Sequence, residues 1–213
     1  MIGGYYFITG AALSLKGDER DTAAAVRAGV RTVQYRDVLS SPREFYAKAK
    51  RLRAICKNAA FIINDRIDAC LAVDADGVHL GQGEYSCKMA RSILGAKKII
   101  GITVHSAAEA SRAQQDGADY LGVSPVFSTR TKSDAGRGRG IKLIKNVKKV
   151  SRLPVAAIGG IDLENAPRVI EAGADAVCAI SAVVTKKDVE KEIHKFQSLF
   201  KARLHSCPPR QRR

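Results

Sequence analysis

Short apolar runs recur along the whole chain and are separated by longer amphipathic segments. The runs are almost continuously hydrophobic rather than alternating, which is typical of strands in a parallel sheet that is buried on both faces. We therefore expect eight strands. They cover Tyr5–Thr9, Val30–Tyr35, Ala60–Ile63, Gly77–Leu80, Lys98–Val104, Tyr120–Val123, Pro154–Ile158 and Ala176–Ile180.

The segments between these runs have the length and the apolar spacing of helices. Ser41 followed by Pro42 marks one helix start, and Ser106 with Glu109 three residues later predicts a capping box at another. The expected helices are Thr22–Ala28, Pro42–Lys57, a short one ending at Val73, Tyr85–Leu94, one from Ser106 to Asp116, Ile141–Val150, Leu163–Ala172 and Asp188–Phe200.

Similar glycine-containing junctions precede several of the strands, at Ala28–Val30, Asp74–Val78, Asp116–Val123 and Ala172–Val177. We expect each glycine to end a helix in the left-handed conformation. Eight equal strand–helix units predict an α/β fold, a single-domain (β/α)8 TIM barrel. An open doubly wound sheet is the alternative, but the first strand–helix turn lacks the G-x-G-x-x-G pattern.

Length and charge divide the chain into residues 1–200, the barrel, and residues 201–213, a basic tail that we expect to be disordered. The net charge of +15 points to an anionic partner. Nucleic acid is not favoured, because only 6% of the residues are aromatic and tryptophan is absent. Phosphorylated small molecules explain the charge better.

The five cysteines are scattered and form no C-x-x-C pair, which predicts a reducing cytoplasm without a disulfide framework or structural zinc. No apolar run reaches membrane-spanning length, and no segment has the features of a signal peptide.

Polar residues gather where the predicted strands end. In a barrel of this type the active site lies at that end. The residues are Gln34, Arg36, Asp37, Asn64, Asp65, His79, Gln82, Glu84, Thr103, His105, Ser124, Thr129, Arg130, Thr131, Lys132, Gly159, Gly160 and Ser181.

The distribution predicts two anion sites, a monophosphate site after the last two strands and a cation-rich zone formed by Arg36, Lys132 and a possible metal ion. Gly159-Gly160 and Ile180-Ser181 follow the seventh and eighth strands, where such barrels commonly bind a phosphate. Asp65 and Glu84 follow neighbouring strands and could hold Mg²⁺, which takes one or two carboxylates together with substrate phosphates. Two carboxylates in these places are also compatible with helix caps or ion pairs.

The longest polar segment, residues 122–140, combines hydroxyls, cations and glycines after the sixth strand. Hydroxyl groups and Arg or Lys side chains can close together over a phosphate. The glycines at positions 136, 138 and 140 predict a mobile segment that closes on the substrate.

At these residues the chain resembles the thiamine-phosphate synthase (thiamine-phosphate pyrophosphorylase) family. The resemblance extends from Tyr5 to Ala182. It rests on the motifs VQYR (33–36), FIINDRIDACLAVDADGVHLGQ (61–82), IGITVHS (100–106), GVSPVFSTRTKSDAGRGRG (122–140), PVAAIGGI (154–161) and AGADAVCAISA (172–182).

The resemblance implies a transferase that joins a hydroxymethylpyrimidine diphosphate to a thiazole phosphate and releases pyrophosphate in thiamine biosynthesis. The cofactor would be Mg²⁺ at Asp65 and Glu84. Arg36, Lys132 and Thr103 would act in catalysis. Substrate-binding residues would be Gln34, Tyr35, Arg36, Asn64, Thr103, Thr129, Arg130, Thr131, Lys132, Gly160, Ile180 and Ser181.

The same resemblance implies that pyrophosphate leaves first and that the thiazole nitrogen then captures the pyrimidine-methyl cation. No protein nucleophile is required, and the sequence offers no convincing Ser/His or Cys/His pair. A homo-oligomer is compatible with the family, whose members are often oligomeric.

Two positions depart from the family pattern. Val38 stands where a lysine is usual after Q-x-R-x, and Glu84 stands where the second metal ligand is usually Asp. Arg130 or Arg137 could replace the missing lysine charge.

Two other functions are compatible with the sequence. One is the related thiazole tautomerase, although no histidine lies in residues 124–140, where that relative would carry its acid–base group. The other is a non-catalytic nucleic-acid-binding or regulatory barrel. His79 and His105 are interpreted as structural residues.

Overall fold

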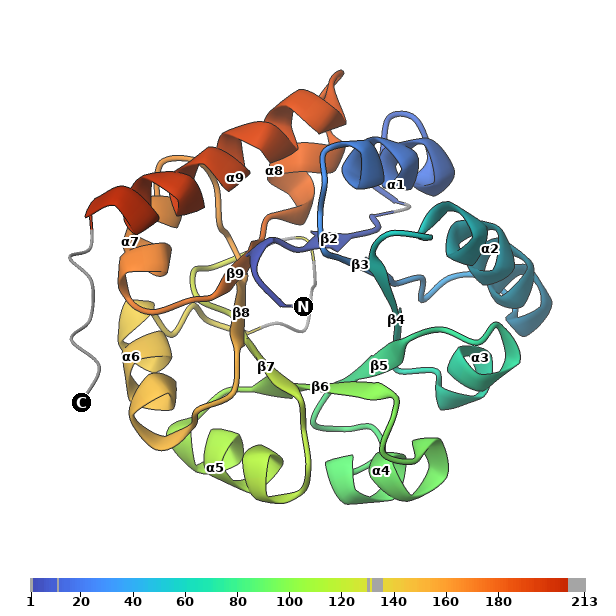
Figure 1. Ribbon diagram of the computed structural model, residues 1–213, viewed down its shortest axis with the longest axis horizontal. Coiled ribbons are helices and arrows are strands. Elements are labelled where there is room, and N and C mark those ends of the chain that lie inside the picture. The colour runs from blue at the N-terminus through green and yellow to red at the C-terminus, as the bar shows by residue number, and fades with distance from the viewer. Residues whose placement is uncertain (1, 11, 130, 132–135, 207–213) are drawn as a thin grey trace.

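A ring of parallel strands surrounded by helices forms the molecule (Figure 1). The computed structural model describes residues 2–10, 12–129, 131 and 136–206, without the side chains of 203–206. Within that part the strands are β1 (Gly4–Tyr5), β2 (Phe7–Ile8), β3 (Thr32–Tyr35), β4 (Ala60–Asn64), β5 (Gly77–Leu80), β6 (Ile99–Val104), β7 (Tyr120–Val123), β8 (Val155–Ile158) and β9 (Ala176–Cys178).

The predicted first strand is divided at Tyr6, and this division closes the barrel. β1 pairs in parallel with β9, whereas β2 pairs in parallel with β3. Between them the backbone N–H of Tyr6 donates to the carbonyl of Val177 at 3.0 Å. The remaining strands pair in sequence order. The expected (β/α)8 barrel is confirmed, and an open sheet is excluded because both edges meet at residues 4–8.

Nine helices occur in the described part of the chain, one more than expected. They are α1 (Asp18–Arg27), α2 (Pro42–Ile55), α3 (Ile67–Ala72), α4 (Cys87–Leu94), α5 (Ala107–Gln115), α6 (Ile141–Val150), α7 (Ala166–Glu171), α8 (Ile180–Val184) and α9 (Val189–Ser206). Ile180, expected to end the last strand, instead begins the short helix α8.

The carboxyl-terminal helix is longer than the sequence suggested. Residues 201–206 continue α9, so the prediction that the disordered tail begins at residue 201 is wrong for this stretch. Residues 207–213 lie outside the described residues. No described helix is both long enough and apolar enough to cross a membrane.

Helix starts follow the local sequence closely. The Ser41 hydroxyl accepts from the Glu44 backbone N–H, and the Glu44 side chain returns to Ser41, which makes a full capping box. Ser106 caps α5 as predicted, accepting from the N–H of Glu109 at 3.1 Å. The Glu109 carboxylate, however, accepts from the backbone N–H of His105 at 2.7 Å instead of reaching Ser106.

Left-handed residues end three helices at the predicted glycines, with φ of 76° at Gly29, 90° at Gly117 and 109° at Gly173. The fourth junction differs. There Asp74 is left-handed with φ 49°, and Gly77 lies inside β5. A side chain at Gly77 would collide with the backbone of Ile99 on β6, so this glycine permits close strand pairing.

Two hydrophobic cores lie on the two faces of the sheet. The larger one lies between the strands and the helices and contains residues such as Val33 and Tyr35. The smaller one fills the barrel interior with Tyr6, Ile8, Tyr120, Ala156, Ala176 and Cys178. Successive strand residues point to opposite faces, so neighbours in one strand contribute to different cores.

An aspartate before three of the strands repeats the same arrangement at the amino-terminal end of the barrel. Asp76, Asp119 and Asp175 each accept a hydrogen bond from the first backbone N–H groups of the preceding strand, at 2.7 to 2.8 Å. Each also pairs with a basic residue of a helix, as Arg91 does with Asp119 at 2.7 Å. The amino-terminal end of the barrel therefore carries contacts that stabilise the fold. The carboxyl-terminal end is where barrels of this type carry their active sites.

Candidate active site

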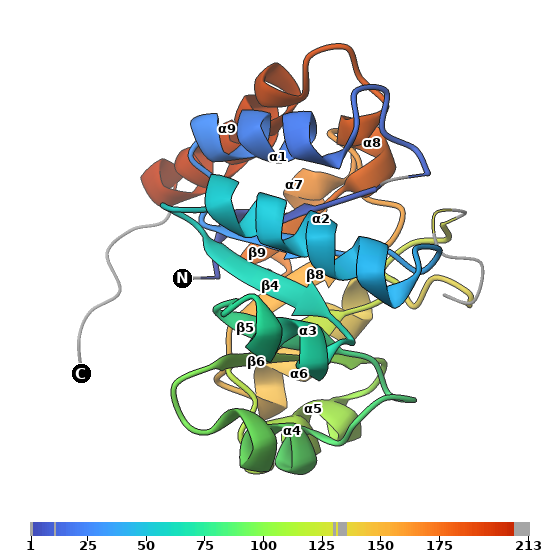
Figure 2. The ribbon, with the colours of Figure 1, turned by 90° about the vertical axis from the view of Figure 1, so that its right-hand side faces the viewer.

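A cavity of about 490 Å³ opens at the carboxyl ends of the strands. In the side view the arrow of β4 points toward this end, and the described parts of the segment between β7 and α6 project there (Figure 2). Its described lining includes these predicted site residues: Gln34, Arg36, Asn64, Asp65, Glu84, Thr103, Thr129, Thr131, Gly160, Ile180 and Ser181. Arg130 and Lys132, also predicted, lie outside the described residues.

Tyr35 is the described predicted residue that does not reach the cavity. It is fully buried on the helix-facing side of β3, its ring packs 4.5 Å from that of Phe45, and its hydroxyl donates to Asp37. The alternation of the strand explains this position, because Gln34 points into the barrel and the next residue must point out. Tyr35 therefore belongs to the outer core rather than to the substrate site.

The floor of the cavity is a chain of hydrogen bonds that crosses the barrel. Gln34 Nε2 donates to the Tyr6 hydroxyl at 2.9 Å, and the hydroxyls of Tyr6 and Tyr120 are 2.8 Å apart. His79 connects this chain to Thr103, with Nδ1 2.9 Å from the Tyr120 hydroxyl and Nε2 2.9 Å from Thr103 Oγ1. The chain joins residues of β3, β5, β6 and β7 through Tyr6. It holds in place the side chains at its two ends, Gln34 and Thr103.

Burial keeps the two tyrosines of this chain protonated. Desolvation raises the pKa of Tyr6 and of Tyr120 far above the usual value near 10, and the proximity of the two hydroxyls raises that of Tyr120 further. The hydroxyls therefore act as neutral hydrogen-bonding groups at physiological pH. They can orient Gln34 and Thr103 but cannot serve as bases.

One half of the cavity, at the ends of β3 to β5, combines a cation with carboxylates. Arg36 follows β3, and its backbone is held by Thr9, whose Oγ1 accepts from the Arg36 N–H at 3.0 Å. Asn64 ends β4, and its Nδ2 donates to Asp65 Oδ2 at 2.5 Å. Glu84 is exposed at the rim of the same half.

Asp65 occupies an unusual backbone conformation, with φ 61°. Its N–H donates to the carbonyl of His79 at 2.9 Å, which ties the end of β4 to that of β5. Left-handed residues other than glycine cost free energy and are often found at functional sites, where the surrounding structure holds them. The conformation places this carboxylate at the cavity.

The other half, at the ends of β7 to β9, consists mainly of hydroxyls and glycines. Val126 and Phe127 donate backbone hydrogen bonds to Ile158 and Gly159 at 2.9 Å, which holds the segment after β7 against the turn after β8. A Cβ on Gly159 would lie 2.8 Å from the Cα of Pro125. Gly160 is left-handed, with φ 60°, so both glycines are required by this close packing.

The two histidines at strand ends differ in their surroundings. His105 Nδ1 lies 2.6 Å from the carbonyl oxygen of Ser124, so it joins the ends of β6 and β7. Both histidines line the cavity, but His79 also contacts a predicted catalytic residue, Thr103.

Several cavity residues were not predicted from the sequence as part of the substrate site, among them Tyr6, Tyr120, His79 and Arg139. Tyr6 and Tyr120 occupy positions of the predicted strands that point into the barrel, and this alternation is the sequence feature that could have placed them in the cavity. Val38, at the position of the family lysine, is 66% exposed and does not line the cavity.

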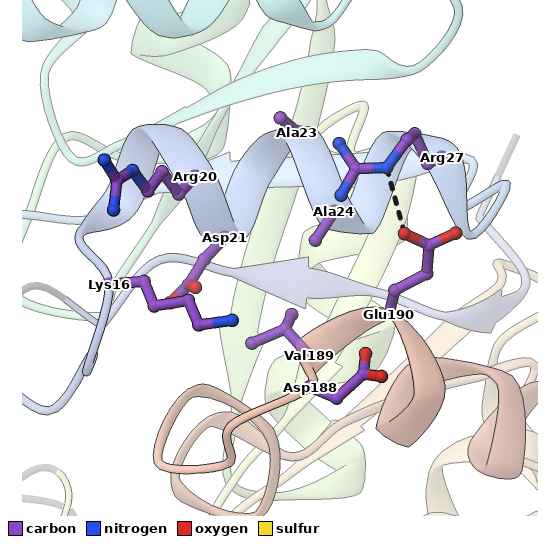
Figure 3. A pocket seen from close by; sticks show the side chains of 9 residues that line it. All are labelled: Lys16, Arg20, Asp21, Ala23, Ala24, Arg27, Asp188, Val189 and Glu190. Carbon is purple, nitrogen blue, oxygen red and sulfur yellow. Dashed lines mark hydrogen bonds and ion pairs between the residues drawn. The ribbon is translucent and has the colours of Figure 1, made fainter.

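A second hollow of about 360 Å³ lies between α1 and the start of α9 (Figure 3). Its walls carry cations and carboxylates in equal measure, and Arg27 donates to Glu190 at 2.9 Å. None of the described strand-end residues lines it. Its charges largely compensate one another, so we interpret it as a crevice between two packed helices.

Comparison with known proteins identifies the family. A family model described as thiamine monophosphate synthase matches residues 5–183. The thiamine-phosphate synthase of Methanosarcina mazei is 48% identical over 198 residues, covering 92% of this chain and 82% of the relative. That of Methanosarcina barkeri is 47% identical, covering 92% and 90%.

The chain belongs to the thiamine-phosphate synthase family.

A solved structure agrees with this assignment. The thiamine phosphate pyrophosphorylase of Pyrococcus furiosus superposes with a TM-score of 0.85 at 35% identity, covering 93% of this chain and 96% of that one. The residues matched by the family model, 5–183, include the whole described cavity lining, from Tyr6 to Ser181.

Proposed function

We propose that this enzyme of the thiamine-phosphate synthase family binds its two substrates side by side in the one cavity. The pyrimidine diphosphate would lie over Gln34 and Thr103, with its diphosphate toward Arg36 and Asn64. The thiazole phosphate would place its phosphate among Thr129, Thr131, Gly160, Ile180 and Ser181. The observation that carries this proposal is that both halves open into a single cavity with one hydrogen-bonded floor.

We further propose Mg²⁺ as the cofactor, held by Asp65 and Glu84. Both carboxylates line the diphosphate half of the cavity. The described residues contain no group of three or more metal-binding side chains, so substrate oxygens and water would complete the coordination, as is usual for Mg²⁺. When bound, the ion would neutralise charge that develops on the leaving diphosphate.

The proposed reaction needs no protein nucleophile. The bond between the pyrimidine methylene carbon and the diphosphate oxygen breaks, and pyrophosphate leaves with the electron pair. The lone pair of the thiazole nitrogen then forms the new C–N bond. Arg36 and Asn64 would bind the leaving group, and donors that are already in place stabilise such a developing charge most effectively. Thr103, held by His79, would orient the pyrimidine ring.

A direct assay tests the proposal. The purified protein is mixed with hydroxymethylpyrimidine diphosphate, thiazole phosphate and Mg²⁺, and thiamine phosphate is measured by mass spectrometry. We expect product that disappears with EDTA and falls at least roughly 100-fold in Asp65→Asn, because a metal ligand is lost. Asp68→Asn is the matched control, because Asp68 is exposed and its carboxylate pairs with Arg66 outside the cavity.

Each result has a distinct meaning. Undiminished product after EDTA treatment would contradict the metal proposal while leaving the reaction intact. A complete lack of product, with both substrates still bound, would contradict the synthase activity and favour a tautomerase or a non-catalytic barrel. The relatives from Methanosarcina and Pyrococcus carry the synthase name, which supports the formation of thiamine phosphate.

We also propose a cytoplasmic location. The four described cysteines, Cys56, Cys70, Cys87 and Cys178, are buried and free, as suits a reducing compartment. Fractionation of the source cells with detection of the chain would test this.

A further inference from the structure

The two permanently charged cations among the described cavity residues lie in opposite halves of the cavity. Arg36 follows β3 and lies beside Asn64 and Asp65 in the diphosphate half. Arg139 comes from the segment between β7 and α6. The proposed substrates carry two separate anionic groups, a diphosphate and a phosphate. Each half of the cavity therefore has one described arginine that could bind one of these groups.

Backbone contacts assign Arg139 to the half that carries the hydroxyls. Its N–H donates to the carbonyl of Pro125 at 3.0 Å, and the next residue, Gly140, donates to Val126 at 2.7 Å. Val126 in turn is bonded to Ile158 at the end of β8. Arg139 is therefore anchored where β7 and β8 end, next to the turn that contains Gly160.

The glycines on both sides of Arg139 allow this anchoring. A Cβ on Gly138 would lie 2.7 Å from the backbone carbon of Phe127, and Gly140 is left-handed with φ 72°. The backbone is thus packed tightly while the arginine side chain remains exposed at the cavity mouth. A fixed backbone with an exposed guanidinium suits a group that must bind a soluble anion.

The remaining described polar groups of this half are neutral hydroxyls and backbone groups, from Ser124, Thr129, Thr131, Gly160 and Ser181. A phosphate monoester carries close to two negative charges at neutral pH. Guanidinium groups bind phosphate through charge-assisted and often bidentate hydrogen bonds, which neutral groups cannot replace.

We infer that Arg139 binds the phosphate of the thiazole substrate and makes the enzyme select the phosphorylated thiazole over the free alcohol. This inference rests on the proposed function for the identity of the substrate. It differs from the expectation that Arg130 or Arg137 supplies an additional cation, because Arg137 does not line the cavity and Arg130 lies outside the described residues.

Equilibrium binding tests the inference without requiring turnover. Isothermal titration calorimetry would measure Kd for thiazole phosphate and for the corresponding thiazole alcohol. The variants are Arg139→Gln, Arg139→Lys and the control Arg137→Gln, which removes the same charge two residues away. We expect Arg139→Gln to raise Kd for the phosphate roughly 10- to 100-fold and to leave Kd for the alcohol unchanged. Arg139→Lys should recover part of the affinity, and Arg137→Gln should match the wild type.

Steady-state kinetics locate the effect. The KM for thiazole phosphate should rise in Arg139→Gln while the KM for the pyrimidine diphosphate stays constant. An equal loss in Arg137→Gln, an unchanged Kd, or a rise confined to the pyrimidine diphosphate would each overturn the inference. A wild type that binds thiazole phosphate through Arg139 but forms no thiamine phosphate would refute the proposed function alone.

Discussion

His79 holds Thr103 through a 2.9 Å contact between its Nε2 and the threonine Oγ1, while its Nδ1 lies 2.9 Å from the hydroxyl of Tyr120. When Gln34 donates to Tyr6, every hydroxyl in the chain is satisfied if donation continues through Tyr120 to His79 Nδ1. His79 then carries its proton on Nε2 and donates to Thr103. Under the proposed function, the threonine O–H would then be available to donate to the pyrimidine ring.

A double-mutant cycle would show whether the two residues act as one unit. We expect His79→Phe and Thr103→Val each to lower kcat/KM for the pyrimidine diphosphate roughly 10- to 100-fold, because each removes the oriented donor. The double variant should lose little more than either single one, giving a coupling of about 1–2 kcal/mol. Nitrogen-15 NMR of His79 should report the Nε2–H tautomer. Additive losses would show that the residues act independently.

Gly122 allows the His79 ring to take its place. A Cβ on this buried β7 glycine would lie 2.7 Å from His79 Cε1 and 3.0 Å from Nε2. Gly122→Ala should therefore displace the ring from Thr103 and lower turnover to about the level of His79→Phe. Gly83→Ala is the control, because a Cβ at that cavity residue meets no atom within 4 Å. Full activity in Gly122→Ala, with the variant folded by circular dichroism, would contradict the positioning role.

Asp37 contributes stability that depends on pH. Burial alone would raise its pKa, but hydrogen bonds from the Ser40 side chain and from the backbone of Leu39 and Ser40 lower the pKa to about 2. The native carboxylate is thus favoured over the unfolded one, whose pKa is near 3.9. Its contribution of roughly 1–2 kcal/mol is complete above about pH 5 and declines as the pH falls toward 2.

Urea unfolding of Asp37→Asn against the wild type checks this sign. The free energy of unfolding should be lower in the variant at pH 7, and the difference should stay constant down to about pH 5. Below that it should shrink. A difference that grows as the pH falls would show that the carboxylate is destabilised by burial instead of stabilised by its hydrogen bonds.

Asp119 should matter for stability and not for catalysis. It accepts from the Ile100 N–H at 2.8 Å and from Arg91 at 2.7 Å, at the end of the barrel away from the cavity. Asp119→Ala leaves the buried Ile100 N–H without an acceptor and should cost about 1–3 kcal/mol of unfolding free energy.

Activity at 25 °C should be unchanged in that variant, and thermal denaturation should register the loss. Asp116→Ala is the control, because the described structure shows no hydrogen bond or ion pair for that carboxylate, and a change within about 0.5 kcal/mol is expected. Reduced turnover in Asp119→Ala at full folding would show that the two ends of the barrel are coupled.

Local pattern was sufficient for much of this protein. The strand at Tyr120–Val123 and the helix at Ile141–Val150 occur at the predicted bounds. Ser106 caps its helix as predicted. These features depend on neighbouring residues, because backbone preference, helix capping and apolar periodicity act over a few positions. The strand-end rule likewise placed the described site residues other than Tyr35 on the cavity, since parallel strands in a barrel end on one face.

Tertiary structure decided the features that depend on distant residues. The break at Tyr6 follows from pairing with β9 on one side and β3 on the other. Gly77 does not end a helix, because its place in β5 lies directly against the backbone of Ile99 on β6. Tyr35 points outward because the strand alternates around Gln34. The Tyr6–Tyr120–His79 chain and the position of Arg139 join segments far apart in sequence. Only the closure and packing of the barrel bring such groups within hydrogen-bonding distance, and no local preference encodes that distance.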